Sequence, residues 1–242
     1  MPIPTVIWGA SGHAKVAADI LSLIPEYRLA GFVDDVNAAR HEESFFDSTV
    51  LAGNKDKLIE NLWNQGVRHA LIGIGDNKAR LELAELLTAE GFQLIKAVHP
   101  SAIIGSDVTV GEGTLIAAGA VINAATKIGK CAIVNTCASV DHDCVISDGV
   151  HIGPGCRVAG GVTVGKYAWL GIGATVIDKR SIGEDPIVIW GSGEQRRSYV
   201  HASDCARIMV ELVERGWTDG PVNIGDETTI SLPEAVSLIA DA

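Results

Sequence analysis

One feature limits the fold of this chain more than any other: an aliphatic residue recurs at every sixth position through its middle. Starting at Ile104 and ending at Ile182, fourteen successive positions in this phase hold Ile, Val or Leu. Four positions after each aliphatic residue, small side chains such as Ala120, Ala138 and Cys156 dominate. A period of six with one large and one small inward residue suits a triangular prism, in which each repeat supplies a short strand and a corner.

Three such repeats complete one coil of roughly eighteen residues, and successive coils stack at about the 4.8 Å spacing of β-strands. Each aliphatic residue then lies above its counterpart in the coil below. A doubly wound sheet would need helices in this stretch, and none can be read. Residues 104–183 thus resemble the hexapeptide-repeat family, which implies a left-handed parallel β-helix.

The N-terminal third alternates between buried strands and helices, which predicts a small parallel α/β sheet. We expect strands at 4–9, 29–33, 69–73 and 93–98, and helices at 14–23 and 78–90. The glycine-containing turn at 9–12 lies between the first strand and the first helix, where backbone N–H groups can bind a phosphate. The turn lacks a full G-x-G-x-x-G, which disfavours NAD, and a purely structural turn remains the alternative.

Composition excludes several classes of partner. The formal net charge of −11 argues against nucleic acid or an anionic membrane surface. No segment has the pattern of a signal peptide or the length of a membrane span. The five cysteines are odd in number and form no C-x-x-C pair, so we expect free thiols, no metal site and a cytoplasmic protein.

Several separate motifs in the same order make residues 3–184 resemble the sugar O- and N-acyltransferases related to sialic-acid O-acetyltransferase. The matching segments are 9–15, 32–35, 72–77, 99–102, 135–136 and 140–144. In that family the N-terminal sheet holds a nucleotide-linked amino sugar, and acetyl-CoA lies between the prisms of neighbouring subunits in a trimer. The resemblance implies acetyl-CoA-dependent N-acetylation of a UDP- or GDP-linked 4-amino-deoxyhexose by a homotrimer.

The candidate catalytic residue is His142. It follows the inward Val140 by two positions, which places it near a corner of the prism. A histidine can take a proton from the attacking amine and return one to the departing thiolate near pH 7. Asp141 and Asp143 flank it, and one of them can orient the imidazole. The resemblance favours Asp143, and a solvated surface histidine is the alternative.

The remaining candidates are binding residues. For the nucleotide sugar we expect Gly9, Ser11, Gly12, His13, Asp34, Asp35, Gly75 and Asn77. The resemblance places His13 near the sugar, and a helix-capping role is its alternative. For acetyl-CoA we expect His151, Gly160 and Lys166. The resemblance places His151 near the thioester, whereas Lys166 is available to the phosphates by its charge.

The six-residue period stops after Gly183, and the C-terminal tail that helps the hexapeptide family to bind CoA is missing. Residues 185–242 instead resemble the C-terminal part of nucleotide-sugar epimerases of the extended short-chain dehydrogenase type, with helices expected at 203–215 and from 232. In that class an arginine at the place of Arg197 contacts the nucleotide diphosphate. No tyrosine begins a Tyr-x-x-x-Lys motif, so epimerase activity is not expected.

These observations predict three domains. Residues 1–98 form a Rossmann-like nucleotide-sugar-binding domain, residues 99–184 a left-handed β-helix acyltransferase domain, and residues 185–242 an epimerase-like fragment. Three alternatives to N-acetylation remain open. They are O-acetylation of a sugar, a non-catalytic nucleotide-sugar-binding or assembly module, and a nucleotide-sugar oxidoreductase or epimerase.

Overall fold

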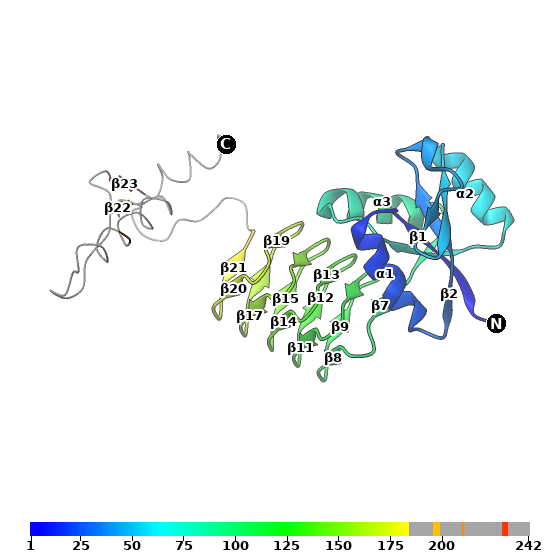
Figure 1. The fold of residues 1–242 in the computed structure, drawn as a ribbon. Coiled ribbons are helices and arrows are strands. Elements are labelled where there is room, and N and C mark those ends of the chain that lie inside the picture. The colour runs from blue at the N-terminus through cyan, green and yellow to red at the C-terminus, as the bar shows by residue number, and fades with distance from the viewer. Residues whose placement is uncertain (184–195, 199–209, 211–228, 232–242) are drawn as a thin grey trace. The chain divides into compact units, whose positions relative to one another are not determined.

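The chain divides into two units, Met1–Glu184 and Asp185–Ala242. The computed structural model in Figure 1 describes residues 1–183, 196–198, 210 and 229–231. In the second unit, β22 (Arg196–Ser198) pairs with β23 (Thr229–Ser231) in an antiparallel ladder. The helices expected at 203–215 and from 232 lie outside the described residues, as does the side chain of Arg197.

A mixed six-stranded sheet opens the first unit, in the order β3-β4-β2-β1-β5-β6. Its strands are β1 (Ile3–Trp8), β2 (Tyr27–Asp34), β3 (Ser44–Phe45), β4 (Ser48–Ala52), β5 (His69–Ile72) and β6 (Gln93–Leu94). The five strands other than β3 run parallel. The parallel sheet was predicted from the sequence, whereas its strand β4 was not. The exception is an antiparallel hairpin of β3 and β4, whose turn residues Phe46 and Asp47 both have positive φ, 42° and 54°.

Helices cover both faces of this sheet: α1 (Gly12–Ser22), α2 (Lys55–Asn64) and α3 (Asn77–Ala89). A short 3₁₀ turn, Ala38–Arg40, precedes β3. Side chains of β1 alternate between the two faces, so that Ile7 packs with α1 whereas Val6 and Trp8 pack with α2 and α3. The Asp76 side chain caps α3 by accepting a hydrogen bond from the backbone N–H of Ala79 at 2.7 Å. This cap fixes the position at which α3 begins.

The rest of the first unit is a three-sided prism of two-residue parallel strands (Figure 1). The first face holds β7 (Ala97–Val98), β10 (Leu115–Ile116), β13 (Ile133–Val134), β16 (His151–Ile152) and β19 (Trp169–Leu170). The second face holds β8 (Ile103–Ile104), β11 (Val121–Ile122), β14 (Ser139–Val140), β17 (Arg157–Val158) and β20 (Thr175–Val176). The third face holds β9 (Thr109–Val110), β12 (Lys127–Ile128), β15 (Val145–Ile146), β18 (Thr163–Val164) and β21 (Ser181–Ile182). The left-handed parallel β-helix predicted from the repeat is therefore confirmed.

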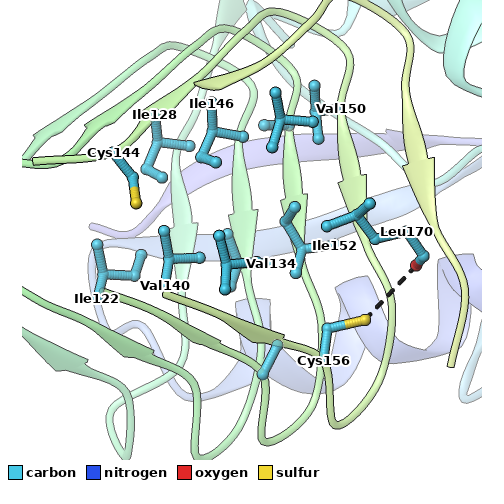
Figure 2. Close-up of a cluster of buried hydrophobic side chains, with 14 of the residues drawn as sticks. Ile122, Ile128, Val134, Val140, Cys144, Ile146, Val150, Ile152, Cys156 and Leu170 are labelled. Atoms are coloured by element: carbon cyan, nitrogen blue, oxygen red, sulfur yellow. Dashed lines mark hydrogen bonds between the residues drawn. The ribbon is translucent and has the colours of Figure 1, made fainter. Parts of the chain in front are cut away.

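The core of the prism is built as the period of six predicts. Paired strands are offset by one coil, so that Val140 lies beside Val158 and Val158 beside Val176. Figure 2 shows aliphatic side chains from the three faces meeting inside the prism, with Cys144 and Cys156 at the small positions. Each fully buried Val, Ile or Leu side chain contributes on the order of 1.5–3 kcal/mol to stability.

Residues 93–98, expected to form one strand, form two. Ile95 donates its backbone N–H to Ala70 in the sheet, whereas Ala97 donates to Thr114 in the prism, at 3.0 Å each. The chain thus leaves β6 and enters β7 within three residues, because the two short segments pair with different partners. The domain boundary at 98/99 stays a prediction.

Helix α1 covers part of the first face. Its small residues Ala14, Ala17 and Ala18 share one apolar cluster with the outward side chains Leu115 and Ile133. The next outward positions along the same face are His151 and Trp169, and the Trp169 side chain is 68% exposed. The outward column therefore changes from aliphatic to aromatic where the face opens to solvent.

Cys131, Cys144 and Cys156 are buried and Cys137 is exposed, all four as free thiols, while Cys205 lies outside the described residues. Within the part of the chain that the structure describes, no helix has the length and apolar character needed to cross a membrane.

Candidate active site

A cavity of about 660 Å³ opens between the start of α3 and the first face of the prism. Its lining comes from the N-terminal sheet domain and from the prism: Gly75, Asp76, Asn77, Lys78, His151, Tyr167 and Trp169. Three residues that the sequence assigned to binding, Gly75, Asn77 and His151, thus lie together. The first two were assigned to the nucleotide sugar and the third to acetyl-CoA.

His151, which lines the cavity, forms a pair with His13 of α1, with the two ring centroids 6.2 Å apart. Nε2 of His151 lies 3.0 Å from the side-chain amide nitrogen of Asn135. Nε2 of His13 is buried and has no hydrogen-bond partner among the described residues. The N-cap residue of α1 is Ser11, whose side chain makes no capping hydrogen bond. The position of His13 therefore does not support a capping role.

Both histidines of this pair are neutral at pH 7. Burial is the largest of three causes that together lower the pKa of His13 to about 4, and the charges of His151 and Arg80 are the other two. Burial followed by the charge of Arg80 lowers the pKa of His151 to about 4. A neutral imidazole has one donor and one acceptor nitrogen, so each ring can both give and receive a hydrogen bond.

His142 lies in the corner turn 141–144, which joins the second face to the third. Its Nδ1 is 2.8 Å from Oδ2 of Asp143, and both side chains are largely exposed. The hydrogen bond to Asp143 and then the charge of Asp141 raise the pKa of His142. The hydrogen bond to Asp143 leaves Nε2 of His142 as the nitrogen open to a substrate.

Asp141 has a different role from Asp143. Its Oδ1 accepts hydrogen bonds from the side chain of Asn123 and from the backbone N–H of His142, both at 2.8 Å. These two hydrogen bonds lower the pKa of Asp141. Asp141 therefore fixes the backbone of the turn 141–144, whereas Asp143 is hydrogen-bonded to the imidazole of His142.

Gly160 lies one coil above His142. A Cβ atom at position 160 would come within 2.8 Å of both Cε1 and Nε2 of His142. The backbone N–H of Gly161 also donates to the carbonyl of His142 at 2.9 Å. The structure thus places Gly160 against the imidazole of His142. Its assignment to acetyl-CoA stays a prediction.

The glycine-containing turn between β1 and α1 needs glycine at position 9. Gly9 has a φ of +117°, and a Cβ there would lie 2.8 Å from the carbonyl oxygen of Gly73. Ser11 and Gly12 are exposed, and nothing within 4 Å would meet a Cβ on Gly12. The first turn of α1 is therefore open to a ligand.

The two aspartates after β2 are already engaged within the protein. Asp34 pairs with Arg40 at 3.0 Å, and Nη1 of the same arginine donates to the carbonyl of Ala10 at 2.8 Å. Asp35 accepts a hydrogen bond from the indole N–H of Trp8 at 3.0 Å and pairs with Lys55 at 2.9 Å. Asp34 therefore braces the turn at 9–12 through Arg40, whereas Asp35 holds the end of β1 at Trp8.

Asn77 also makes structural contacts. Its Nδ2 donates to the carbonyls of Tyr167 and Ala168 at 2.8 and 3.1 Å, and its Oδ1 accepts from Arg80 at 2.9 Å. Lys166 is exposed, with Nζ 4.9 Å from the ring centroid of Tyr167. Lys166 thus lies beside the cavity and belongs to the corner between the third and first faces.

The prism therefore carries two separate groups of candidate site residues. The cavity with its histidine pair lies on the first face, whereas His142, Asp143 and Gly160 lie at the corner between the second and third faces. The sequence reading missed Tyr167 and Trp169. The period of six could have found Trp169, because it places a large aromatic residue at an outward position of the first face.

Two family models match the chain. The PglD N-terminal domain matches residues 5–87. The NAD dependent epimerase/dehydratase family matches residues 171–225, which agrees with the resemblance of the C-terminal segment.

Known proteins extend the likeness across the prism. UDP-N-acetylbacillosamine N-acetyltransferase of Bacillus subtilis is 36% identical over 114 residues, 46% of this chain and half of that relative's length. The GDP-perosamine N-acetyltransferase of Caulobacter crescentus was crystallised with CoA and GDP-perosamine after one histidine was changed to alanine. It is 40% identical, with a TM-score of 0.69, over 75% of this chain and 83% of that one.

A third relative, the acetyltransferase domain of PglB from Neisseria gonorrhoeae in complex with acetyl coenzyme A, is 26% identical. It has a TM-score of 0.63 over 75% of this chain and 96% of that one. The shared fold, the matched N-terminal model and the 40% identity lead to one assignment. This chain belongs to the family of nucleotide-sugar N-acetyltransferases built on a hexapeptide-repeat prism.

Proposed function

We propose that this protein transfers an acetyl group from acetyl-CoA to the amino group of a UDP- or GDP-linked amino sugar. The observation that carries the proposal is the exposed His142–Asp143 pair, joined at 2.8 Å on a corner of the prism. The N-acetyltransferase activities of the relatives from Bacillus subtilis and Caulobacter crescentus support this reaction class. Since acetyl-CoA is an intracellular metabolite, we place the reaction in the cytoplasm.

In the proposed mechanism His142 is the general base. Its Nε2 takes the proton from the sugar amine as the nitrogen attacks the thioester carbonyl, so that the C–N bond forms. Asp143, hydrogen-bonded to Nδ1, stabilises the imidazolium and keeps the ring in place. The imidazolium then gives its proton to the departing thiolate as the C–S bond breaks, and the base is restored.

The nucleotide sugar is proposed to bind along the N-terminal domain. The open first turn of α1 at Ser11 and Gly12 suits a phosphate, and the neutral His13 can hydrogen-bond the sugar. Gly9 and Asp34 shape this turn, Asp35 holds the end of β1 before it, and Gly75 and Asn77 continue the surface into the cavity. For acetyl-CoA, His151 and Lys166 remain the proposed contacts at the cavity, with Gly160 beside the base.

We also propose that the active unit is a homotrimer. The base and the cavity lie on different sides of one prism, so a single copy cannot bring them to one substrate. A neighbouring copy can present its His142 corner to this cavity, and threefold closure repeats that contact three times. Light scattering that finds an active monomer would contradict the trimer.

A mixing experiment tests whether the site is shared between subunits. His142→Ala and His151→Ala are each expected to be poorly active alone. When the two variants are co-expressed, some interfaces combine an intact base with an intact cavity, so activity should return. If each subunit carried its whole site, every site in the mixture would hold a defect and no activity would return.

The function itself is tested by ligand binding and product chemistry. Thermal stabilisation is measured side by side with acetyl-CoA, UDP-sugars, GDP-sugars and NAD, and stabilisation by acetyl-CoA and one nucleotide sugar is expected. Stabilisation by NAD alone would overturn the proposal.

The product should resist mild alkali as an amide does, whereas an alkali-labile ester would indicate O-acetylation. Binding of both ligands without transfer would indicate a non-catalytic module.

A further inference from the structure

Arg80 on α3 is one of the most buried side chains of the first unit, with 1% of its surface exposed. Its Nε donates to the carbonyl of Cys131 at 2.8 Å, and Nη1 donates to the carbonyls of Ile74 and Gly75 at 3.1 and 3.0 Å. Nη2 donates to Oδ1 of Asn77 and to the carbonyl of Gly149, both at 2.9 Å. All five N–H groups of the guanidinium are therefore used.

These hydrogen bonds connect two parts of the first unit. Three of the acceptors lie in the loop 74–77, which forms one wall of the cavity. The other two, Cys131 and Gly149, lie on successive coils at the corner between the third and first faces. Asn77 extends the contact to the next coil through the carbonyls of Tyr167 and Ala168. The opposite wall of the cavity, with His151, stands on the same coils.

We propose that Arg80 is a positioning residue for the transfer site, fixing the loop 74–77 on the prism so that the two walls of the cavity keep their spacing. The inference rests on the proposed function, because it assigns the cavity to the substrates of that reaction. Misplacement of reacting groups by about 1 Å can cost about 10²-fold in rate. The planar guanidinium of Arg80, buried and with five hydrogen-bond donors, is suited to holding such a spacing.

The charge of Arg80 has a second effect. All five acceptors are neutral, and no carboxylate among the described residues forms an ion pair with Arg80. The charge therefore acts on the two histidines at the cavity and adds to the effect of burial on the pKa of each. Besides each other and Arg80, these histidines share the site with three titratable lining residues, Asp76, Lys78 and Tyr167.

The test compares Arg80→Lys, which keeps the charge but has at most three donors, with Arg80→Met, which loses both. Arg68→Met is the control, because Arg68 also donates to backbone carbonyls but lies beside Trp63 on α2, away from the cavity. We expect both Arg80 variants to lower kcat/KM by about tenfold or more. The control should stay within about twofold of the native chain.

The titrations of His13 and His151, followed by NMR, separate positioning from a general loss of stability. Arg80→Met should raise the titration midpoints of both rings, whereas Arg80→Lys should leave them near the native values. A folded Arg80→Met variant with native kinetic constants and native midpoints would overturn the proposal. If Arg80→Met does not fold, native kcat/KM in both Arg80→Lys and Asn77→Ala would overturn it.

The NMR titrations also distinguish this inference from the proposed function. They require no turnover, so they report on Arg80 even if the native chain transfers no acetyl group. Absence of transfer by the native chain would remove the proposed function alone. If the native chain is active and the Arg80 variants have the same kinetic constants and titration midpoints as the native chain, this inference alone is removed.

Discussion

The imidazole of His142 lies directly against the backbone of Gly160, one coil further along the prism. A Cβ at position 160 would approach Cε1 and Nε2 of the ring to 2.8 Å. Nε2 is the nitrogen that the hydrogen bond to Asp143 leaves open. Glycine at position 160 therefore keeps the space that the proposed base occupies.

Gly160→Ala should consequently displace the ring. Since the His142 side chain is exposed and free to move, we expect little loss of stability but a fall in kcat of about tenfold. Gly171→Ala is the matched control, because no atom lies within 4 Å of a Cβ there. Equal kcat values for the two variants would show that the contact has no catalytic consequence.

His142→Ala removes the proposed base altogether. Turnover should fall by about 10²–10⁴, the range for general acid–base catalysis, while the dissociation constant of the nucleotide sugar stays near its native value. His99→Ala, which alters a half-buried histidine on a different corner, serves as the control. Native turnover by folded His142→Ala protein would exclude His142 from the mechanism.

Asp143→Asn should change the pH dependence of kcat/KM. Asp143 is the main cause of the raised pKa of His142, and the reaction needs the neutral ring, so the rate declines as pH falls through that pKa. Removing the carboxylate lowers the pKa, so the acid limb of the profile should move to lower pH. Asp141→Asn should move it less, in the same direction, because the charge of Asp141 is the second cause. An unmoved acid limb in Asp143→Asn would contradict the assignment.

The buried histidines make stability depend on pH. The pKa of His13 is lowered from 6.5 to about 4, so between these values the unfolded chain binds a proton that the folded chain does not. The contribution of His13 to the free energy of unfolding is fully present above pH 6.5. It declines as pH falls toward 4, by up to about 3 kcal/mol. His151 adds to the same trend. When the free energy of unfolding in urea is plotted against pH over this range, the slope should be smaller for His13→Gln than for the native chain. An equal slope would refute the prediction.

Deletion of residues 185–242 should leave residues 1–184 folded. The core of the prism ends at Ile182, and the chain divides into units at the same place. We expect the truncated protein to melt cooperatively and to keep its native KM values for acetyl-CoA and the sugar. A raised KM for acetyl-CoA alone would show that the segment replaces the missing CoA-binding tail. A truncated chain that cannot fold would show that the boundary is wrong.

The fold was predictable because its patterns are periodic. The inward series through Val140 and Val158 defines the prism, and the alternation of strands and helices defines the sheet. The hairpin of β3 and β4 was missed because its turn, Phe46-Asp47, lacks the Asn-Gly or Asp-Gly signal of such turns. Helix α2 was missed although Leu58, Ile59 and Leu62 form one apolar face.

The candidate site was only partly predictable. Motifs singled out His13, His142 and His151, but they carry no information on how α1, the prism corner and the first face place these three residues relative to one another. The contact of Gly160 with His142 could have been found, because the two positions differ by one coil of eighteen residues, as do Lys130 and Asp148. Arg80 could not, because a buried guanidinium bound to backbone carbonyls leaves no spacing pattern in a sequence.

The contacts of Arg80 and Asn77 have a consequence for how such a protein can change in length. They reach the prism at Cys131, Gly149 and Tyr167, and His142 lies between the first two in the chain. The position of the proposed base along the prism, relative to the N-terminal sheet, is therefore set by the number of whole coils, or turns of the prism, between it and these contacts. A descendant could gain a turn beyond Val176 without altering its chemistry. A turn gained or lost between Cys131 and His142 would shift the proposed base along the prism, away from the level of the cavity.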